Sequence, residues 1–178
     1  MTAATEFSRP VRLDALGERP VERAIEAEEQ ERAALATRFD LLALDRLEGR
    51  FAIARQAGGV VVTGEVDADV RQSCVVSGEP VATRIREAVD LRFVREAAPD
   101  EADEIELAGQ DLDTLPLEGE SIDLGEIAAE TMALALPPFP RADDAALAEA
   151  RRSLLSEEEA ARLSAAANNP FAKLKRQD

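Results

Sequence analysis

The chain has 178 residues, 46% of them hydrophobic, so we expect one domain with one packed core. It carries 37 acidic and 21 basic side chains, a net charge of −16, with one cysteine and no His, Tyr or Trp. These counts exclude nucleophilic catalysis with an imidazole base, a zinc site of four Cys and His ligands, and a disulfide within the chain.

Two elements are expected before residue 40. Residues 7–13 alternate weakly in hydropathy and predict an edge strand, where Pro10 is tolerated. Residues 20–37 predict a helix, because Pro20 suits a first turn and the residues after it are rich in Glu and Ala. Val21, Ile25 and Leu35 are its only large apolar residues on one face.

The strongest pattern is an antiparallel meander between residues 47 and 94. Residues 47–55, 60–74 and 81–94 each alternate apolar and polar side chains, which is typical of strands with one buried and one solvated face. A turn is predicted between the last two strands at Gly78, Glu79 and Pro80.

The negative charge is concentrated in the segment after this meander. Residues 96–140 contain 13 acidic side chains and no basic one, so the rest of the chain is almost neutral. Residues 96–121 predict a mobile acidic loop, with a short strand possible at 104–107. This loop is either simply solvated or a surface for a basic partner such as a ribosomal protein, and its candidate contacts include Asp100, Glu101, Asp103 and Glu104.

A helix is predicted over residues 123–136. Asp123 is the expected N-cap and Glu126 the N3 residue of a capping-box variant, with Ile122 and Ile127 placed for a hydrophobic staple. The two prolines at 137–138 end the helix.

The fold class predicted is therefore α+β, with an antiparallel sheet that could close into a barrel and two helices packed on it. Residues 1–140 are expected to form this single domain. Residues 141–178 are expected to be a helical or flexible extension, ending in a short docking motif at Asn169, Pro170 and Phe171. This motif lies beside Lys173, Lys175 and Arg176 and could dock on a partner or back onto its own domain.

Two further features have both a structural and a functional interpretation. Cys74 ends an inward-facing row, so a buried inert thiol is favoured over a metal-site remnant or a redox thiol, and only Arg71 lies close enough in sequence to lower its pKa. The row Arg84, Arg86 and Arg92 could contact phosphate, but balancing the acidic side chains of the neighbouring strand is favoured.

Several motifs together resemble one known family. They are the Cys74-Val-Val-Ser-Gly-Glu-Pro80 element, the Ile122-Asp-Leu-Gly-Glu helix start that leads into Leu136-Pro-Pro, and the final Asn169-Pro-Phe-Ala-Lys-Leu174. Their order resembles the YceD family of large ribosomal RNA subunit accumulation proteins, over roughly residues 10–176.

The resemblance implies a cytoplasmic bacterial protein needed for accumulation of 23S rRNA. It implies no catalytic residues. Many members carry a second cysteine three positions after the first and more cysteines after the proline-terminated helix; Ser77 and the cysteine-free residues 137–141 take those places here, so no metal or cofactor is expected.

The leading hypothesis is a non-enzymatic ribosome biogenesis factor. It would contact a basic ribosomal protein or a large-subunit assembly intermediate, and any contact with rRNA would be indirect. The alternatives are direct rRNA binding through the arginine row and, less favoured, a metal-dependent nuclease. No signal peptide or membrane-spanning segment is expected.

Overall fold

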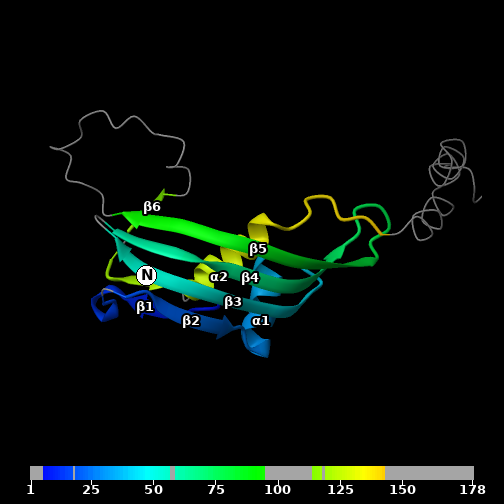
Figure 1. Ribbon diagram of the computed structural model, residues 1–178. Helices are drawn as coiled ribbons and strands as arrows, with labels where there is room; N and C mark the ends of the chain where they lie inside the picture. The colour runs from blue at the N-terminus through cyan, green and yellow to red at the C-terminus, as the bar shows by residue number, and fades with distance from the viewer. Residues whose placement is uncertain (1–5, 18, 57–58, 95–113, 118, 143–178) are drawn as a thin grey trace, which may run out of the picture.

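The computed structural model describes residues 6–17, 19–56, 59–94, 114–117 and 119–142 (Figure 1). Within these ranges the chain forms an open five-stranded sheet of order β2-β3-β4-β5-β6, a small two-stranded sheet of order β1-β7, and two α-helices. The strands are β1 (Pro10–Arg12), β2 (Val21–Glu26), β3 (Ala43–Gln56), β4 (Gly59–Ser73), β5 (Pro80–Val94), β6 (Thr114–Pro116) and β7 (Ser121–Asp123). The helices are α1 (Glu29–Arg38) and α2 (Leu124–Leu134), and a 3-10 turn lies at Leu13–Ala15.

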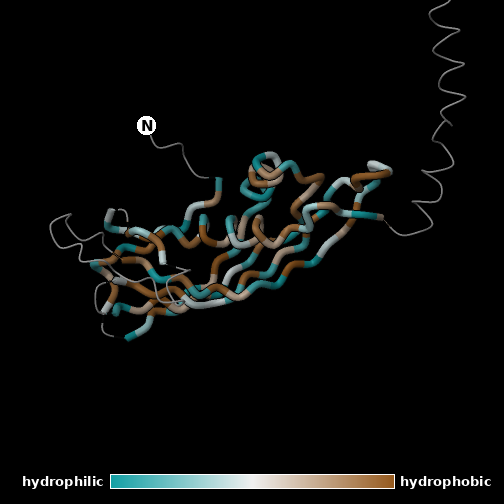
Figure 2. Tube along the Cα trace, turned by 90° about the horizontal axis from the view of Figure 1, so that it is seen from above, coloured by the Kyte–Doolittle hydropathy of each residue, from teal (hydrophilic) through white to brown (hydrophobic). Residues whose placement is uncertain are grey.

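The predicted meander is confirmed as the centre of the large sheet. β3, β4 and β5 pair antiparallel along most of their length, with one register shift between Leu44 and Arg46. Leu47 lies opposite Ala68, and Ala68 lies opposite Ile85. These three residues lie on the buried face of the sheet. The residues that flank each of them along its own strand lie on the opposite, solvated face. Figure 2 shows the resulting alternation of hydrophobic and hydrophilic positions along the strands.

The sheet does not close into a barrel, which corrects one part of the predicted fold. Its two ends are β2 and the short parallel strand β6, and these do not pair with each other. The inner face is covered instead by α2, which packs against β3, β4 and β5. A helix on an open sheet buries that face without the strand curvature that a barrel needs.

One core joins the sheet to α2 and the N-terminal segment. Its fully buried large side chains include Phe7, Leu47, Ile53, Leu124 and Met132. The helix therefore contributes to the same core as the meander, as the α+β class predicts.

The helix predicted over residues 20–37 is wrong in its first half. Residues 21–26 form β2, in which Val21 pairs with Ile53 and Ile25 with Gly49, and the helix α1 begins only at Glu29. Its N-cap is Glu28, in a capping box with Glu31. The high helix propensity of Glu and Ala was outweighed by pairing with β3, which places the alternating Val21 and Ile25 against the core.

The loop predicted over residues 96–121 is also wrong in part. Thr114–Pro116 adds β6 to the large sheet beside Arg92–Val94, and Ser121 begins β7. β7 pairs with β1, so the predicted N-terminal edge strand exists, but in the small sheet. The possible strand at 104–107 and the extension from residue 143 onward lie outside the described residues.

The predicted helix near residues 123–136 is confirmed as α2. The Asp123 carboxylate accepts the backbone N–H groups of Gly125 (2.9 Å) and Glu126 (3.4 Å), so it is the N-cap. Ile122 and Ile127 are both buried, consistent with the staple. Glu126 does not complete a capping box, because both of its carboxylate oxygens accept hydrogen bonds from Arg38 at 2.6 and 3.0 Å.

Candidate functional site

The turn between β4 and β5 surrounds the sulfur of Cys74 with hydrogen-bond donors. Cys74 is 3% exposed, so its predicted burial is confirmed. Its Sγ accepts the backbone N–H groups of Val76 (3.5 Å), Ser77 (3.4 Å) and Ala142 (3.3 Å). These bonds favour the thiolate, and with the Ser77 hydroxyl as the largest cause they lower the pKa of Cys74 to about 6.

Gly78, Glu79 and Pro80 close this turn, as predicted. Gly78 has φ +75°, which a residue with a side chain rarely adopts, and its N–H donates to the Cys74 carbonyl at 2.9 Å. The Glu79 carbonyl accepts the Cys74 N–H at 2.8 Å. The three residues therefore hold the geometry around the sulfur.

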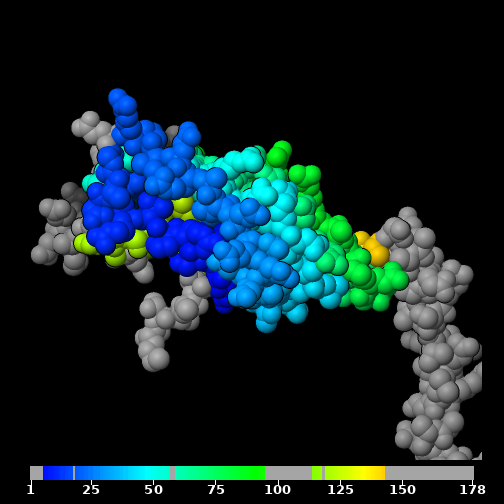
Figure 3. All heavy atoms as spheres, turned by 90° about the horizontal axis from the view of Figure 1, so that it is seen from below, coloured from blue at the N-terminus to red at the C-terminus, as the bar shows by residue number. Residues whose placement is uncertain are grey.

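The segment after α2 is bound against the same turn. The Val75 N–H donates to the Pro140 carbonyl at 3.0 Å, and the Gln72 side chain donates to the Pro137 carbonyl at 3.2 Å. Figure 3 shows the segment that follows α2, in orange, beside the green residues of the β4–β5 hairpin. Sequence reasoning about Cys74 missed this contact, because the donor Ala142 lies 68 positions away.

The described residues at this turn do not fit a metal site. Around Cys74 lie the Ser77 hydroxyl and the backbone N–H groups of Val76, Ser77 and Ala142, which are not metal ligands. The described residues hold no group of three or more Cys, Asp or Glu side chains placed to bind a metal ion.

Two arginines of the row on the solvated face of the sheet, Arg84 and Arg86, form ion pairs. Arg86 Nε lies 3.1 Å from Asp67 and 3.5 Å from Glu65, and Arg84 lies 3.9 Å from Asp69. The guanidinium of Arg86 holds the pKa of Asp67 below its ordinary value. The predicted charge balance between the two strands is confirmed for Arg84 and Arg86.

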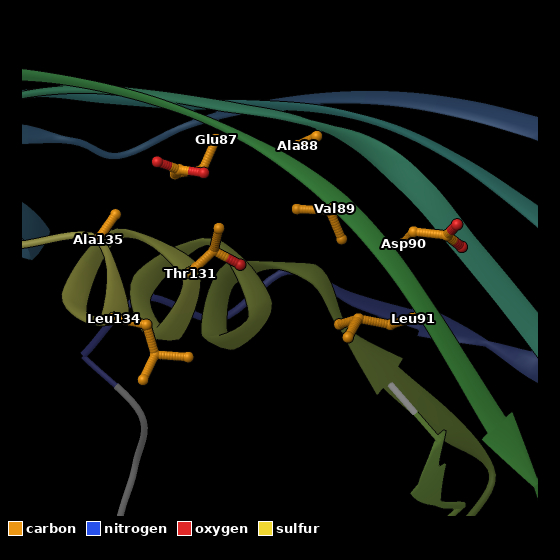
Figure 4. A pocket seen from close by; sticks show the side chains of 8 residues that line it. All are labelled: Glu87, Ala88, Val89, Asp90, Leu91, Thr131, Leu134 and Ala135. Atoms are coloured by element: carbon orange, nitrogen blue, oxygen red, sulfur yellow. The ribbon is translucent and has the colours of Figure 1, made fainter. Parts of the chain in front are cut away.

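A groove runs along the seam between α2 and β5. It consists of two shallow hollows of about 410 and 220 Å³. Leu91 of β5 and Thr131 of α2 line the first, and their near neighbours Phe93 and Glu130 line the second, so the two hollows are adjacent along the seam. In Figure 4, Val89 and Leu91 point from β5 toward α2, and Thr131 and Ala135 point from the helix toward the strand. Leu134 projects away at the rim and is 89% exposed.

Among the described residues that line the groove, every charged one is acidic. They are Glu87, Asp90, Asp123, Glu126 and Glu130. Asp123 caps α2 and Glu126 binds Arg38, so both predicted site residues have structural partners. The Asp90 side chain points away from α2 (Figure 4), on the opposite face of β5 from Val89 and Leu91. Glu87 and Glu130 are exposed and form no salt bridge with another described residue.

Sequence reasoning missed this groove, although one signal was present. Glu87 interrupts the inward apolar row of β5 between Ile85 and Val89, which marks the point where that face is uncovered. The remaining predicted contacts, Asp100, Glu101, Asp103, Glu104, Asn169, Pro170 and Phe171, lie outside the described residues.

The fold and the groove define an α+β protein with an open sheet, one covering helix and an acidic seam beside it. The chain belongs to the YceD family: the family model described as "Large ribosomal RNA subunit accumulation protein YceD" matches residues 62–176, well over half of its length. The family implies a role in accumulation of the large ribosomal RNA subunit. Comparisons with curated proteins and with solved structures give no match. No helix among the described residues is long and apolar enough to cross a membrane.

Proposed function

We propose that this protein is a non-enzymatic factor in large-subunit biogenesis that works in the cytoplasm by binding a basic ribosomal protein or assembly intermediate. Family membership supports the role, and the groove beside α2 supports the mode of action. The observation that carries the mode is that Glu87 and Glu130 line an apolar seam with no basic residue among its described lining. Apolar contact with an acidic rim suits a partner segment that is both apolar and basic.

The pairing on the solvated face argues against direct rRNA binding as the main mode. Arg84 and Arg86 face acidic side chains within 3.1 to 3.9 Å, so their charge is already compensated within the sheet. A phosphate contact would have to break these pairs. We therefore place any contact with rRNA second to contact with protein.

A charge-reversal pull-down tests the groove. Glu87→Lys with Glu130→Lys should reduce recovery of large-subunit ribosomal proteins from a ribonuclease-treated lysate by roughly tenfold, since close charges become repulsive. The control is Glu22→Lys with Glu26→Lys, which makes the same change of net charge on exposed residues of β2, at the opposite edge of the sheet. Equal recovery by the two variants would remove the groove from the mechanism. Neutralising Asp100, Glu101, Asp103 and Glu104 tests whether the acidic segment extends this surface.

A further inference from the structure

We propose that the groove between α2 and β5 binds the C-terminal segment of the same chain, residues 169–176. The groove offers two features to an occupant: an apolar wall formed by residues such as Val89 and Leu91, and carboxylates with no partner among the described residues. Leu134 adds an apolar side chain at the rim that is almost completely exposed. An occupant that covers this surface must be apolar on one side and basic on the other.

Residues 169–176 have this composition. Phe171 and Leu174 are large and apolar, and Lys173, Lys175 and Arg176 place three positive charges within four positions. Both lysines of the whole chain lie here. The acidic rim and the basic segment are therefore complementary within one molecule.

The chain is long enough to make this contact. The described part ends at Ala142, whose N–H donates to Cys74 at the β4–β5 turn. From that turn to Leu91 is about 36 Å along β5, at about 3.3 Å per residue. The connection from Ala142 to Phe171 spans about 43 Å even if it is wholly helical, and more than twice that if extended.

The same strand also presents an open edge. Among the described residues, β6 pairs only with Arg92–Val94, so the preceding part of β5 has no neighbour on that side. A single family model covers both the groove-forming elements and the segment up to residue 176, so the two belong to one sequence pattern. Docking would cover Glu87 and Glu130 until a partner displaces the segment, a consequence that rests on the proposed function.

Carbodiimide coupling of the unmodified full-length protein tests this contact directly. The reagent joins a carboxylate to an amine, and the only amines are Lys173, Lys175 and the N-terminus. Mass spectrometry should find lysine coupling to Glu87 and Glu130 about tenfold more often than to the exposed Glu22 and Glu26, because docking holds the lysines near the first pair. Coupling spread evenly over both sets, or concentrated on residues 96–113, would overturn the proposal.

Two controls separate docking in the same molecule from other arrangements. An equimolar mixture of isotope-labelled and unlabelled protein should give products within one copy, and products that join two copies would place the segment on a second molecule and overturn the assignment. The variant Phe171→Ser with Leu174→Ser keeps both lysines and should lose the preference for the groove. An unchanged preference would show charge attraction without docking, which also contradicts the proposal. The coupling experiment contains no partner protein. A negative result would therefore contradict docking of the C-terminal segment without contradicting the proposed function, which the pull-down tests separately.

Discussion

Hydrogen bonds lower the pKa of the Cys74 thiol, and the largest cause is the hydroxyl of Ser77. Backbone N–H groups of Val76, Ser77 and Ala142 and the hydroxyl of Ser77 donate toward it and stabilise the thiolate. Sequence reasoning looked for a basic neighbour, and the cause is instead the shape of the turn and the segment bound against it.

Replacing the largest donor should therefore raise the pKa of the thiol. In Ser77→Ala the pKa of Cys74 should move from about 6 toward its ordinary value near 9. The thiolate absorbance at 240 nm measures this cleanly, because the chain has no Tyr, no Trp and no second cysteine. A native thiol that titrates near 9, or a variant with the native pKa, would contradict this cause.

The same shift makes stability depend on pH. The thiol is ionised in the folded protein above about pH 6 and in the unfolded chain only above about pH 9, so the unfolded chain binds one more proton between these values. The free energy of unfolding should rise with pH across this window and lose that contribution below pH 6. Urea titrations followed by circular dichroism check the sign, and a smaller slope is expected for Ser77→Ala.

The carboxylate of Asp123 holds the start of α2 to the N-terminal segment. Besides capping the helix, it accepts the Arg9 N–H at 2.7 Å and the Ser8 hydroxyl at 2.5 Å. Asp123→Ala should lower the free energy of unfolding by about 2 kcal/mol, the upper end for a cap, and Asp123→Asn by less because an amide oxygen still caps. A loss of the same size in both variants, measured by urea unfolding, would contradict the capping role.

At the scale of elements, α2 lies so close to the N-terminal segment that only glycine fits between them. A Cβ at Gly125 would lie 2.8 Å from the Phe7 carbonyl carbon and collide with its oxygen. Gly125→Ala should cost about 1–3 kcal/mol, because the helix must move away from the backbone beside it.

The matched control is Gly17→Ala, where an added Cβ meets no atom within 4 Å and φ is not positive. It should leave the free energy of unfolding within about 0.5 kcal/mol of the native value. If the two alanine variants unfold at the same urea concentration, the close approach of α2 and Phe7 does not hold.

The elements that sequence predicted best are those whose local pattern and tertiary pairing agree. The strands over 60–74 and 81–94 alternate and pair through most of their length, and Asp123 caps its helix by a contact within three residues. β2 was missed because its Glu and Ala content favours a helix locally, and only the partner strand β3 decides otherwise. β6 and β7 were missed because three residues are too short to show a period.

The candidate site was predictable only where contacts are local. The turn at Gly78, Glu79 and Pro80 is expected from its residue types. The Arg38–Glu126 pair joins positions 88 apart, and the groove exists because α2 leaves part of β5 uncovered. Such features depend on the packing of elements, which no local pattern contains.

At the scale of the whole molecule, the net charge of −16 is distributed unevenly between surfaces. On the solvated face of the sheet, Arg46 and Arg86 are paired with the acidic residues around Asp67. On the other side, the described lining of the seam beside α2 contains no basic residue, and its Glu87 and Glu130 form no salt bridge with another described residue. A basic partner would therefore meet its complement at the seam rather than across the sheet.

The most direct test measures rRNA in cells depleted of the native protein and supplied with variants. The native protein and Glu22→Lys with Glu26→Lys should restore the ratio of large-subunit to small-subunit rRNA, whereas Glu87→Lys with Glu130→Lys should leave it low at equal protein abundance. A ratio that does not fall on depletion would contradict a role in large-subunit rRNA accumulation. Full restoration by the groove variant would contradict action through the acidic seam.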